Sequence, residues 1–238
     1  MSLFKDLLNE HDEREDLFSA FDETRLSDYA RKKRNRRSYE SAELDSTGCT
    51  EIRVDGTVFD AFFLPEHDIV FTREARKIAF CAVHILDDGD DQPNIENIYI
   101  HDEIEEIEAG AFDEINGDEV HIYVEETSPY YMAVDDALFS KDGKRLIWIS
   151  PSKEGNYDVP DGVEEIEDYV AGYYTNLDTL TVPPSVTKLP ASIIEPRHLP
   201  ELGDLSLRGI KGSYIEHWAA ENWYDFEEVE YIPAPLQL

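Results

Sequence analysis

Three segments in the second half of the chain share one hydrophobic pattern. Each begins with two apolar residues in alternation, passes through a polar turn, and ends with an apolar residue, two polar residues and another apolar residue. The segments are residues 98–107, 157–166 and 180–189. Alternation over three or four residues is typical of a short half-buried strand, and Pro-Asp-Gly or Pro-Pro-Ser is typical of the turn that ends it. The pattern therefore predicts short strands, each followed by a tight turn.

The segments recur at a nearly constant interval. Val159 and Val182 are 23 residues apart, Val182 and Leu207 are 25 apart, and Ile100 and Val124 are 24 apart. This period is typical of proteins in which each unit stacks on the next, because one unit of that length cannot bury its own apolar face. We expect strands about 4.8 Å apart over one continuous core. The residues expected to point inward are Ile98, Ile100, Ile104, Ile107, Tyr157, Val159, Val163, Ile166, Leu180, Val182, Val186 and Leu189.

Two further segments have patterns of their own. Lys-Asp-Gly-Lys at 141–144 lies between apolar runs and predicts a tight hairpin over 137–147, which accounts for the longer interval of 35 residues from Val124 to Val159. Residues 212–222 predict a short helix whose apolar face is formed by Tyr214, Trp218 and Ala219.

These motifs resemble one known family. Val-Pro-Asp-Gly-Val-Glu-Glu-Ile at 159–166, Leu-Thr-Val-Pro at 180–183 and Gly-Ala-Phe at 110–112 are similar to the BspA-like (Treponema pallidum type) leucine-rich repeats. The similarity covers roughly residues 95–230. It implies an α/β solenoid rich in β structure: a right-handed leucine-rich repeat superhelix with short strands, an inserted β-hairpin and a C-terminal capping helix. It also implies protein–protein interaction, because members of the family in host-associated bacteria and some protozoa are often surface adhesins.

The chain divides into three parts by pattern. Residues 1–45 form a charged, partly helical extension; residues 46–94 carry strand-like runs without a clear period and are interpreted as an N-terminal cap or divergent repeats. Residues 95–238 form the leucine-rich repeat domain with its C-terminal cap. A cap is needed because the first unit of a stack would otherwise expose its apolar face.

The charge of the chain is strongly negative. It has 54 acidic and 21 basic residues, a net charge of -33, with 41% hydrophobic residues. Such a chain is too apolar to be disordered throughout, and its charge disfavours nucleic acids and anionic membranes as partners. No apolar run reaches the roughly 20 residues that span a bilayer, and the N-terminus does not have the pattern of a signal peptide. We expect a cytoplasmic protein, with the cell surface or secretion as the alternative.

One basic run contrasts with this charge. Residues 31–37, from Arg31 to Arg37, hold six basic residues in seven. The run can be a solvated helix end, a counter-charge that docks on the acidic repeats, an arm that clamps another copy, or a nucleic-acid patch. The acidity of the rest of the chain argues against the last interpretation.

The sequence contains no motif for catalysis or metal binding. The acidic loop at 87–91 does not have the spacing of an EF-hand, the seven histidines form no zinc pair, and Cys49 and Cys81 have no identified histidine partner. A hydrolase would have to gather His84, Cys81 or that loop into one pocket. We therefore expect a non-enzymatic protein without cofactor or metal, whose oligomeric state the sequence leaves open.

The outward residues of the strands remain as the candidate binding surface. Stacking predicts one column of Tyr99, Tyr123, Asp158, Thr181 and Ser206, and a neighbouring column of Asn97, His121, Asn156, Thr179 and Asp204. The candidate partner-binding residues are Tyr99, His101, His121, Tyr123, Asp158 and Thr181. They can form an aromatic interaction surface for a protein, with a basic partner favoured by the charge of the chain, or can be ordinary exposed cross-strand pairs. The alternative function is that of a cell-surface adhesin or carbohydrate-binding protein of a host-associated microbe.

Overall fold

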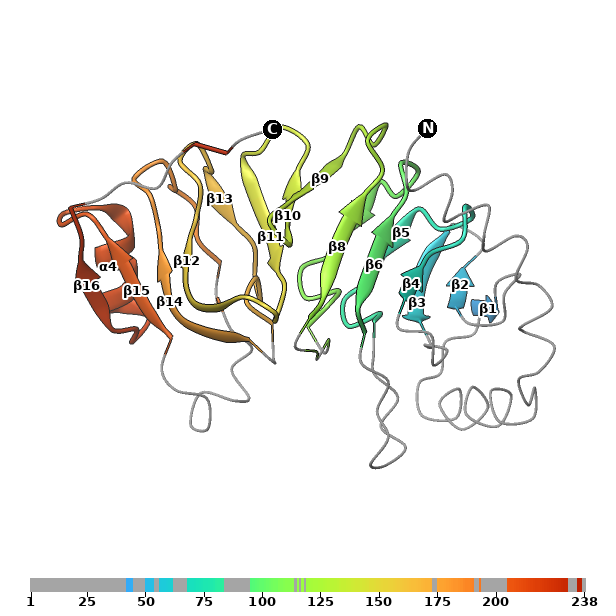
Figure 1. Cartoon of the computed structure of the whole chain (residues 1–238), viewed down its shortest axis with the longest axis horizontal. Helices are drawn as coiled ribbons and strands as arrows, with labels where there is room; N and C mark the ends of the chain where they lie inside the picture. Colours follow the sequence, from blue (N-terminus) through green and yellow to red (C-terminus); the bar gives the residue numbers. More distant parts are fainter. Residues whose placement is uncertain are drawn as a thin grey trace, which may run out of the picture.

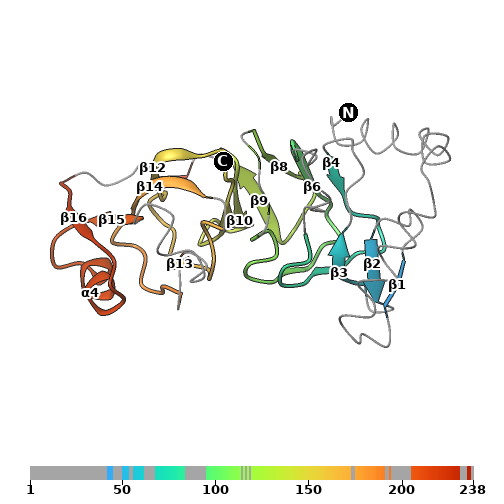
Figure 2. The ribbon, with the colours of Figure 1, turned by 90° about the horizontal axis from the view of Figure 1, so that it is seen from below.

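The structure, a computed structural model, describes most of the chain from residue 42 onward. The described residues are 42–44, 50–53, 56–61, 68–83, 95–113, 115, 117, 119–172, 175–190, 193, 205–230 and 235–236. The basic run at 31–37, Cys49, His84, the acidic loop at 87–91 and Asp204 lie outside them, and the division into three parts stays a prediction. The described strands lie side by side in an elongated array, with β1 (Ala42–Leu44) and β16 (Phe226–Glu228) at opposite ends (Figure 1, Figure 2).

Two parallel sheets, which we call the first and second ladders, form one side of the array. The first ladder consists of β4 (Asp68–Val70), β6 (Asn97–Ile100) and β8 (His121–Val124); the second consists of β12 (Glu154–Asp158), β14 (Asn176–Thr181), β15 (Ser206–Gly209) and β16. Tyr99 pairs with Tyr123, and Tyr157 pairs with Leu180, as the period predicts. Each strand belongs to a different unit, so the chain has a β-rich repeat fold.

A second row of parallel strands follows the turns, and β5 (Lys77–Ile78), β7 (Glu106–Ile107) and β13 (Glu165–Ile166) in it have only two residues each. β3 (Thr57–Ala61), β5 and β7 pair in parallel, in a sheet completed by β1 and β2 (Thr50–Arg53). Farther along, β11 (Arg145–Ile149) pairs in parallel with β13. Ile78, Ile107 and Ile166 are buried, so these strands close the core from the side opposite the ladders.

An antiparallel sheet lies between the two ladders. β9 (Tyr131–Val134), β10 (Ala137–Ser140) and β11 pair antiparallel in sequence, and the turn after β10 has Gly143 at a φ of 71°. The carboxylate of Asp142 accepts hydrogen bonds from the Ser140 hydroxyl at 2.7 Å and from the Lys144 amide at 3.1 Å, which fixes this turn. Strand β9 was not predicted from the sequence.

The core is divided into two clusters. Eleven of the twelve residues expected to point inward are buried, and Leu189 is half-buried. However, Ile100 belongs to one cluster and Val159 and Val182 to another, so the expectation of one continuous core is wrong. The antiparallel sheet is the partition, because the strand alternation of β10 directs Leu138 into the first cluster and Phe139 into the second.

Side-chain hydroxyl groups complete the strand edges at this partition. The Ile107 amide donates to the Tyr131 phenol oxygen at 2.8 Å, and the phenol donates to the Glu105 carbonyl at 3.2 Å. Beside β8, the hydroxyls of Ser150 and Ser152 donate to the Val120 carbonyl at 2.6 and 3.1 Å. These groups replace hydrogen bonds that a further repeat strand would make.

Helix α4 (Tyr214–Glu221) packs on the second cluster near the end of the array. It buries Ile215, Trp218 and Ala219. The predicted apolar face is wrong in one residue, because Tyr214 is exposed and Ile215 takes its place, at the spacing of one helical face.

The helix ends in a backbone hydrogen bond from Tyr224 to the Ala219 carbonyl at 3.0 Å, with Trp223 between them at a φ of 66°. This is the Schellman arrangement, in which glycine is the usual residue at the left-handed position, and another residue there costs about 1 kcal/mol.

We expect Tyr131→Phe to lower the free energy of unfolding by about 1–3 kcal/mol, because the buried Ile107 amide and Glu105 carbonyl lose their partner. Urea unfolding followed by circular dichroism measures this change. Tyr130→Phe is the matched control, since the Tyr130 side chain is 41% exposed. Equal stability of the two variants would contradict the role given to the Tyr131 hydroxyl.

Candidate functional site

The two tyrosines of the first ladder form a stacked pair on its outward side. Their ring centroids are 5.1 Å apart and the rings are inclined by 14°. Tyr99 is 8% exposed and Tyr123 is 37% exposed, so Tyr123 presents most of the accessible ring surface. Burial, with smaller contributions from Asp68 and Tyr123, raises the pKa of Tyr99 to about 12. The Tyr99 phenol is therefore neutral at physiological pH.

A polar row lies beside this pair. The Asn97 side chain donates to the Asp68 carboxylate at 2.7 Å, and His121 Nδ1 lies 3.1 Å from the carboxylate of Asp136 in the turn between β9 and β10. The His121 ring is 6.4 Å from the Tyr123 ring. The structure thus brings together three of the predicted residues, Tyr99, His121 and Tyr123, and surrounds them with carboxylates. This cluster is the aromatic–acidic site.

Sequence reasoning missed the two carboxylates of this site. Asp68 lies in β4, and β4 is one unit earlier than the detected repeats: Val70 pairs with Tyr99 at a spacing of 29 residues rather than 24. Asp136 comes from the turn before the predicted hairpin. A search for apolar alternation at longer intervals would have found Ile69, which pairs with Ile98, but nothing in the sequence points to Asp136.

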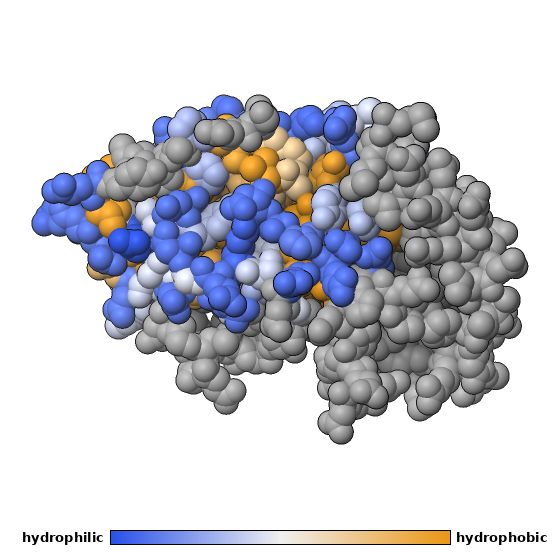
Figure 3. Space-filling model, viewed as in Figure 1, coloured by the Kyte–Doolittle hydropathy of each residue, from blue (hydrophilic) through white to orange (hydrophobic). Residues whose placement is uncertain are grey.

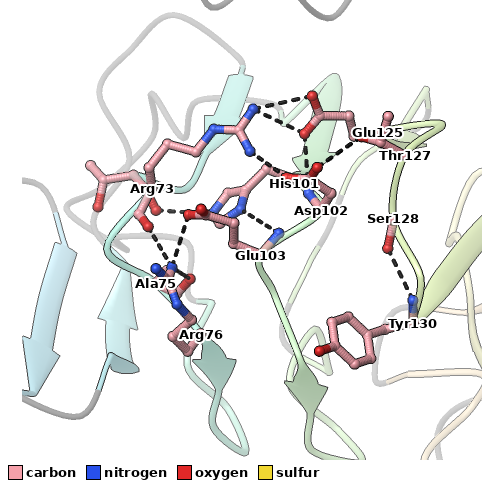
Figure 4. A network of polar contacts seen from close by, with 11 residues as sticks. Arg73, Ala75, Arg76, His101, Asp102, Glu103, Glu125, Thr127, Ser128 and Tyr130 are labelled. Carbon is pink, nitrogen blue, oxygen red and sulfur yellow. Dashed lines mark hydrogen bonds and ion pairs between the residues drawn. The ribbon is translucent and has the colours of Figure 1, made fainter.

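His101 lies beneath the surface, although the sequence placed it among the partner-binding residues. It is 1% exposed; its Nε2 lies 2.9 Å from the Thr72 carbonyl, and its Nδ1 accepts a hydrogen bond from the Glu103 amide at 3.2 Å. Burial lowers the pKa of the imidazole, and the positive charge of Arg73 acts in the same direction. The ring is therefore neutral with its proton on Nε2, and it joins two successive turns (Figure 4).

Arg73 connects three successive turns above this histidine. Its guanidinium pairs with Asp102 at 2.5 Å and with Glu125 at 3.0 Å, and the Thr127 hydroxyl donates to Asp102 at 2.8 Å (Figure 4). Partial burial alone would raise the pKa of Asp102, but the hydrogen bonds from Thr127 and Arg73 outweigh it and lower that pKa. The network stabilises the turns, and its carboxylates are already paired within it.

Asp158 and Thr181 lie on the second ladder, apart from the tyrosines. The Asn156 side-chain oxygen accepts hydrogen bonds from Thr179 at 2.6 Å and Thr181 at 2.9 Å, while its amide donates to Asp158 at 2.6 Å. Thr181 is itself buried. Asn156 is the centre of this group, and sequence reasoning assigned it only to the second column.

The predicted columns are wrong in the last unit. Thr181 pairs with Arg208 and Thr179 pairs with Ser206, a shift of two residues from the predicted alignment. The outward column of the second ladder is therefore Asp158, Thr181, Arg208 and Glu227. The columns also stop at the partition, so the six predicted residues do not form one surface.

The described residues were also compared with what a metal site and a membrane span require. Among them, no three His, Cys, Asp or Glu side chains converge as a metal ion requires. Cys81 is buried. Within the same residues no helix has the length and apolar character needed to cross a membrane.

Comparison with known proteins gives structural neighbours only. No family model and no curated protein sequence matches the chain. Three solved structures resemble it. The pneumococcal vaccine antigen PcpA is 23% identical over 41% of this chain and 24% of its own, with a TM-score of 0.36. A leucine-rich repeat protein from Eubacterium ventriosum is 15% identical over 52% of this chain and 38% of its own, with a TM-score of 0.38. A leucine rich cell surface protein from Faecalibacterium prausnitzii is 19% identical over 52% of this chain and 37% of its own, with a TM-score of 0.37.

The chain thus spans between about a quarter and two fifths of the length of these structures. One of the three is named a leucine-rich repeat protein and another a leucine rich cell surface protein.

We expect the free energy of unfolding to fall as the pH drops below 6.5, the ordinary pKa of histidine. The pKa of His101 is lower in the folded state than in the unfolded state. Below pH 6.5 the unfolded chain therefore binds a proton more readily than the folded chain does, and acid favours unfolding. Urea unfolding over a pH series measures the effect. In His101→Gln the loss should be smaller. An unchanged pH dependence in His101→Gln would contradict this assignment.

Proposed function

We propose that this chain is a non-enzymatic protein–protein interaction module that binds a basic partner at the aromatic–acidic site. The observation that carries the proposal is the stacked pair of Tyr99 and Tyr123 on the outward side of the first ladder, with Tyr123 open to solvent. Tyrosine is enriched at protein interfaces because its ring offers a large apolar area and a polar end at a low cost in conformational entropy.

The charges around the pair support a basic partner. Asp68 and Asp136 flank the rings, and the chain as a whole has a net charge of -33. An arginine or lysine side chain can lie over the exposed ring of Tyr123 and approach these carboxylates, which combines a cation–π contact with ion pairing. The field of the whole chain would attract such a partner from a distance.

The finer architecture belongs to the same proposal. We infer a right-handed leucine-rich repeat superhelix in which β10 and β11 form the inserted hairpin and α4 is the C-terminal cap. The parallel ladders, the antiparallel pairing of β10 with β11 and the burial of Ile215 and Trp218 support this arrangement.

A second candidate function is carbohydrate binding at a cell surface. The exposed ring of Tyr123 favours it, because a flat aromatic surface beside carboxylate and amide groups can also hold a sugar ring. Binding to a glycan array that is lost in Tyr123→Ala would support this function, and with it a surface location, over the protein partner.

We expect Tyr123→Ala to weaken the binding of a protein captured from native lysate by about tenfold or more, as for an aromatic residue at the centre of an interface. Surface plasmon resonance with the purified partner measures the affinity. Tyr130→Ala is the matched control, because Tyr130 is similarly exposed but belongs to the loop before β9. Equal affinity for the native chain and Tyr123→Ala would rule out the aromatic–acidic site.

We also expect the association rate to decrease steeply with added salt, because long-range attraction between opposite charges accelerates encounter and salt screens it. The same resonance experiment at several salt concentrations measures this rate. An association rate independent of salt would contradict the basic partner while leaving the site itself untouched.

A further inference from the structure

The second ladder ends in a strand with one unpaired edge. β16 pairs with β15, and in the part of the chain that the structure describes no strand pairs with the other edge of β16. Such an edge presents backbone N–H and C=O groups to any extended chain that reaches it. β16 is therefore a place where a further strand can add to the ladder.

Trp223 lies three residues before this strand, and its indole lies outside the core. Its side chain is 96% exposed, and its backbone has the left-handed conformation that glycine adopts most easily. The helix end is formed without the indole: the backbone of Tyr224 bonds to Ala219, and the rings of Trp218 and Tyr224 make the apolar contact at 5.3 Å. A residue in a strained backbone conformation whose side chain makes no contact in the core is a candidate for a binding function.

The edge carries an excess of negative charge. Asp225, Glu227, Glu228 and Glu230 are all exposed. The cations that the structure places against them are Arg208, 3.1 Å from Glu227, and Lys211, 3.3 Å from Glu228. Along the outward column Arg208 is followed by Glu227, so a basic residue on an added strand would continue an alternation of opposite charges, which favours cross-strand pairing.

We propose that the basic run at residues 31–37 of a second copy of this chain adds to the free edge of β16, with its arginine and lysine side chains over Trp223 and beside Glu227. Six of these seven residues are basic, and no stretch of seven elsewhere in the sequence holds more than three. Of the aromatic residues, tryptophan gives the strongest cation–π contact. The run thus matches the edge in charge and in the chemistry of its side chains.

The length of the chain requires the run to come from another copy. Arg37 precedes Ala42 of β1 by five residues, which span at most about 18 Å when fully extended. β1 and β16 lie at opposite ends of the array (Figure 1). The two parallel steps of the first ladder and the three of the second already span about 24 Å, and the antiparallel sheet lies between them. The run therefore does not lie along β16 of its own chain.

Such a contact joins the N-terminal segment of one copy to the β16 edge of the next. An interface between two different surfaces of the same chain is heterologous, and it builds rings or open filaments rather than closed two-fold dimers. The association involves neither Tyr99 nor Tyr123, so it stands independently of the proposed function.

Tryptophan fluorescence of the full chain tests the contact directly. Of the three tryptophans, Trp148 and Trp218 are buried and Trp223 is exposed, so covering Trp223 should shift the emission to shorter wavelength. The probe is a synthetic peptide of residues 28–40, titrated into the full chain in which glutamine replaces the six basic residues, so that Trp223 is not already covered. The titration is done at about 50 mM and about 300 mM salt, which separates weak from strong screening. We expect a blue shift at low salt that fades at high salt, and none with a control peptide in which glutamine replaces the six basic residues.

Sedimentation of the full chain under the same conditions measures the self-association. We expect assemblies at low salt, and monomers when glutamine replaces the six basic residues of the run. Trp223→Gly should weaken the association about three- to thirtyfold, as expected for loss of a cation–π contact. It should melt no lower than the native chain, since glycine suits the left-handed position. Glu227→Lys should also abolish assembly, whereas the matched control Glu164→Lys, an exposed glutamate paired with Lys144 away from the edge, should not.

Three results would overturn the proposal. These are a chain that is monomeric at both salt concentrations, an association that is as strong in Trp223→Gly as in the native chain or that persists in Glu227→Lys, and a peptide that leaves the emission of Trp223 unchanged. A monomeric chain whose Trp223 emission nevertheless shifts with an unrelated basic peptide would assign the edge to another protein and refute the self-association.

Discussion

The need to pair the backbone groups of strand edges inside the array governs this structure. In a stack of repeats each strand satisfies its neighbour, and any interruption leaves a row of amides and carbonyls without partners. The antiparallel sheet of β9–β11 interrupts both rows of strands at once. The phenol of Tyr131 bonds to the edge of β7, and the hydroxyls of Ser150 and Ser152 bond to the edge beside β8. Where the two halves of the array meet, these side chains take the place of missing strands.

The same interruption determines where function can reside. Since the ladders do not continue across the partition, the outward residues form two separate surfaces rather than one long face. The first carries stacked aromatic rings between carboxylates, and the second is organised by the Asn156 side chain and by Arg208. A partner bound at the first surface does not contact the second surface, which acts on it only through long-range electrostatic attraction.

The sequence predicted what depends on short-range alternation. It identified the pairing of Tyr99 with Tyr123 and the burial of the inward aliphatic residues, because a strand of period two must direct those side chains to one side. It failed in the last unit for a reason that also follows from that period. Leu205 and Leu207 are both buried, and a shift of two residues keeps the same face inward, so the pattern cannot choose between the two registers. His101 was misplaced because a histidine directly after a strand reads the same whether its ring turns outward or, as here, into the turn.

Aromatic residues of the same type occur both in the core and on the surface of this structure. Tyr131 and Trp218 are buried and make contacts within the fold, whereas Tyr123 is 37% exposed and Trp223 is 96% exposed. Burying an aromatic ring is favourable, so a folded chain that leaves one exposed forgoes stability at that position. The two exposed rings lie in different places, one on the face of the first ladder and one at the end of the second. Binding of a partner at Tyr123 therefore does not compete for space with association at Trp223, and copies joined end to end would present the aromatic–acidic site repeatedly to one partner, which increases avidity without any new contact.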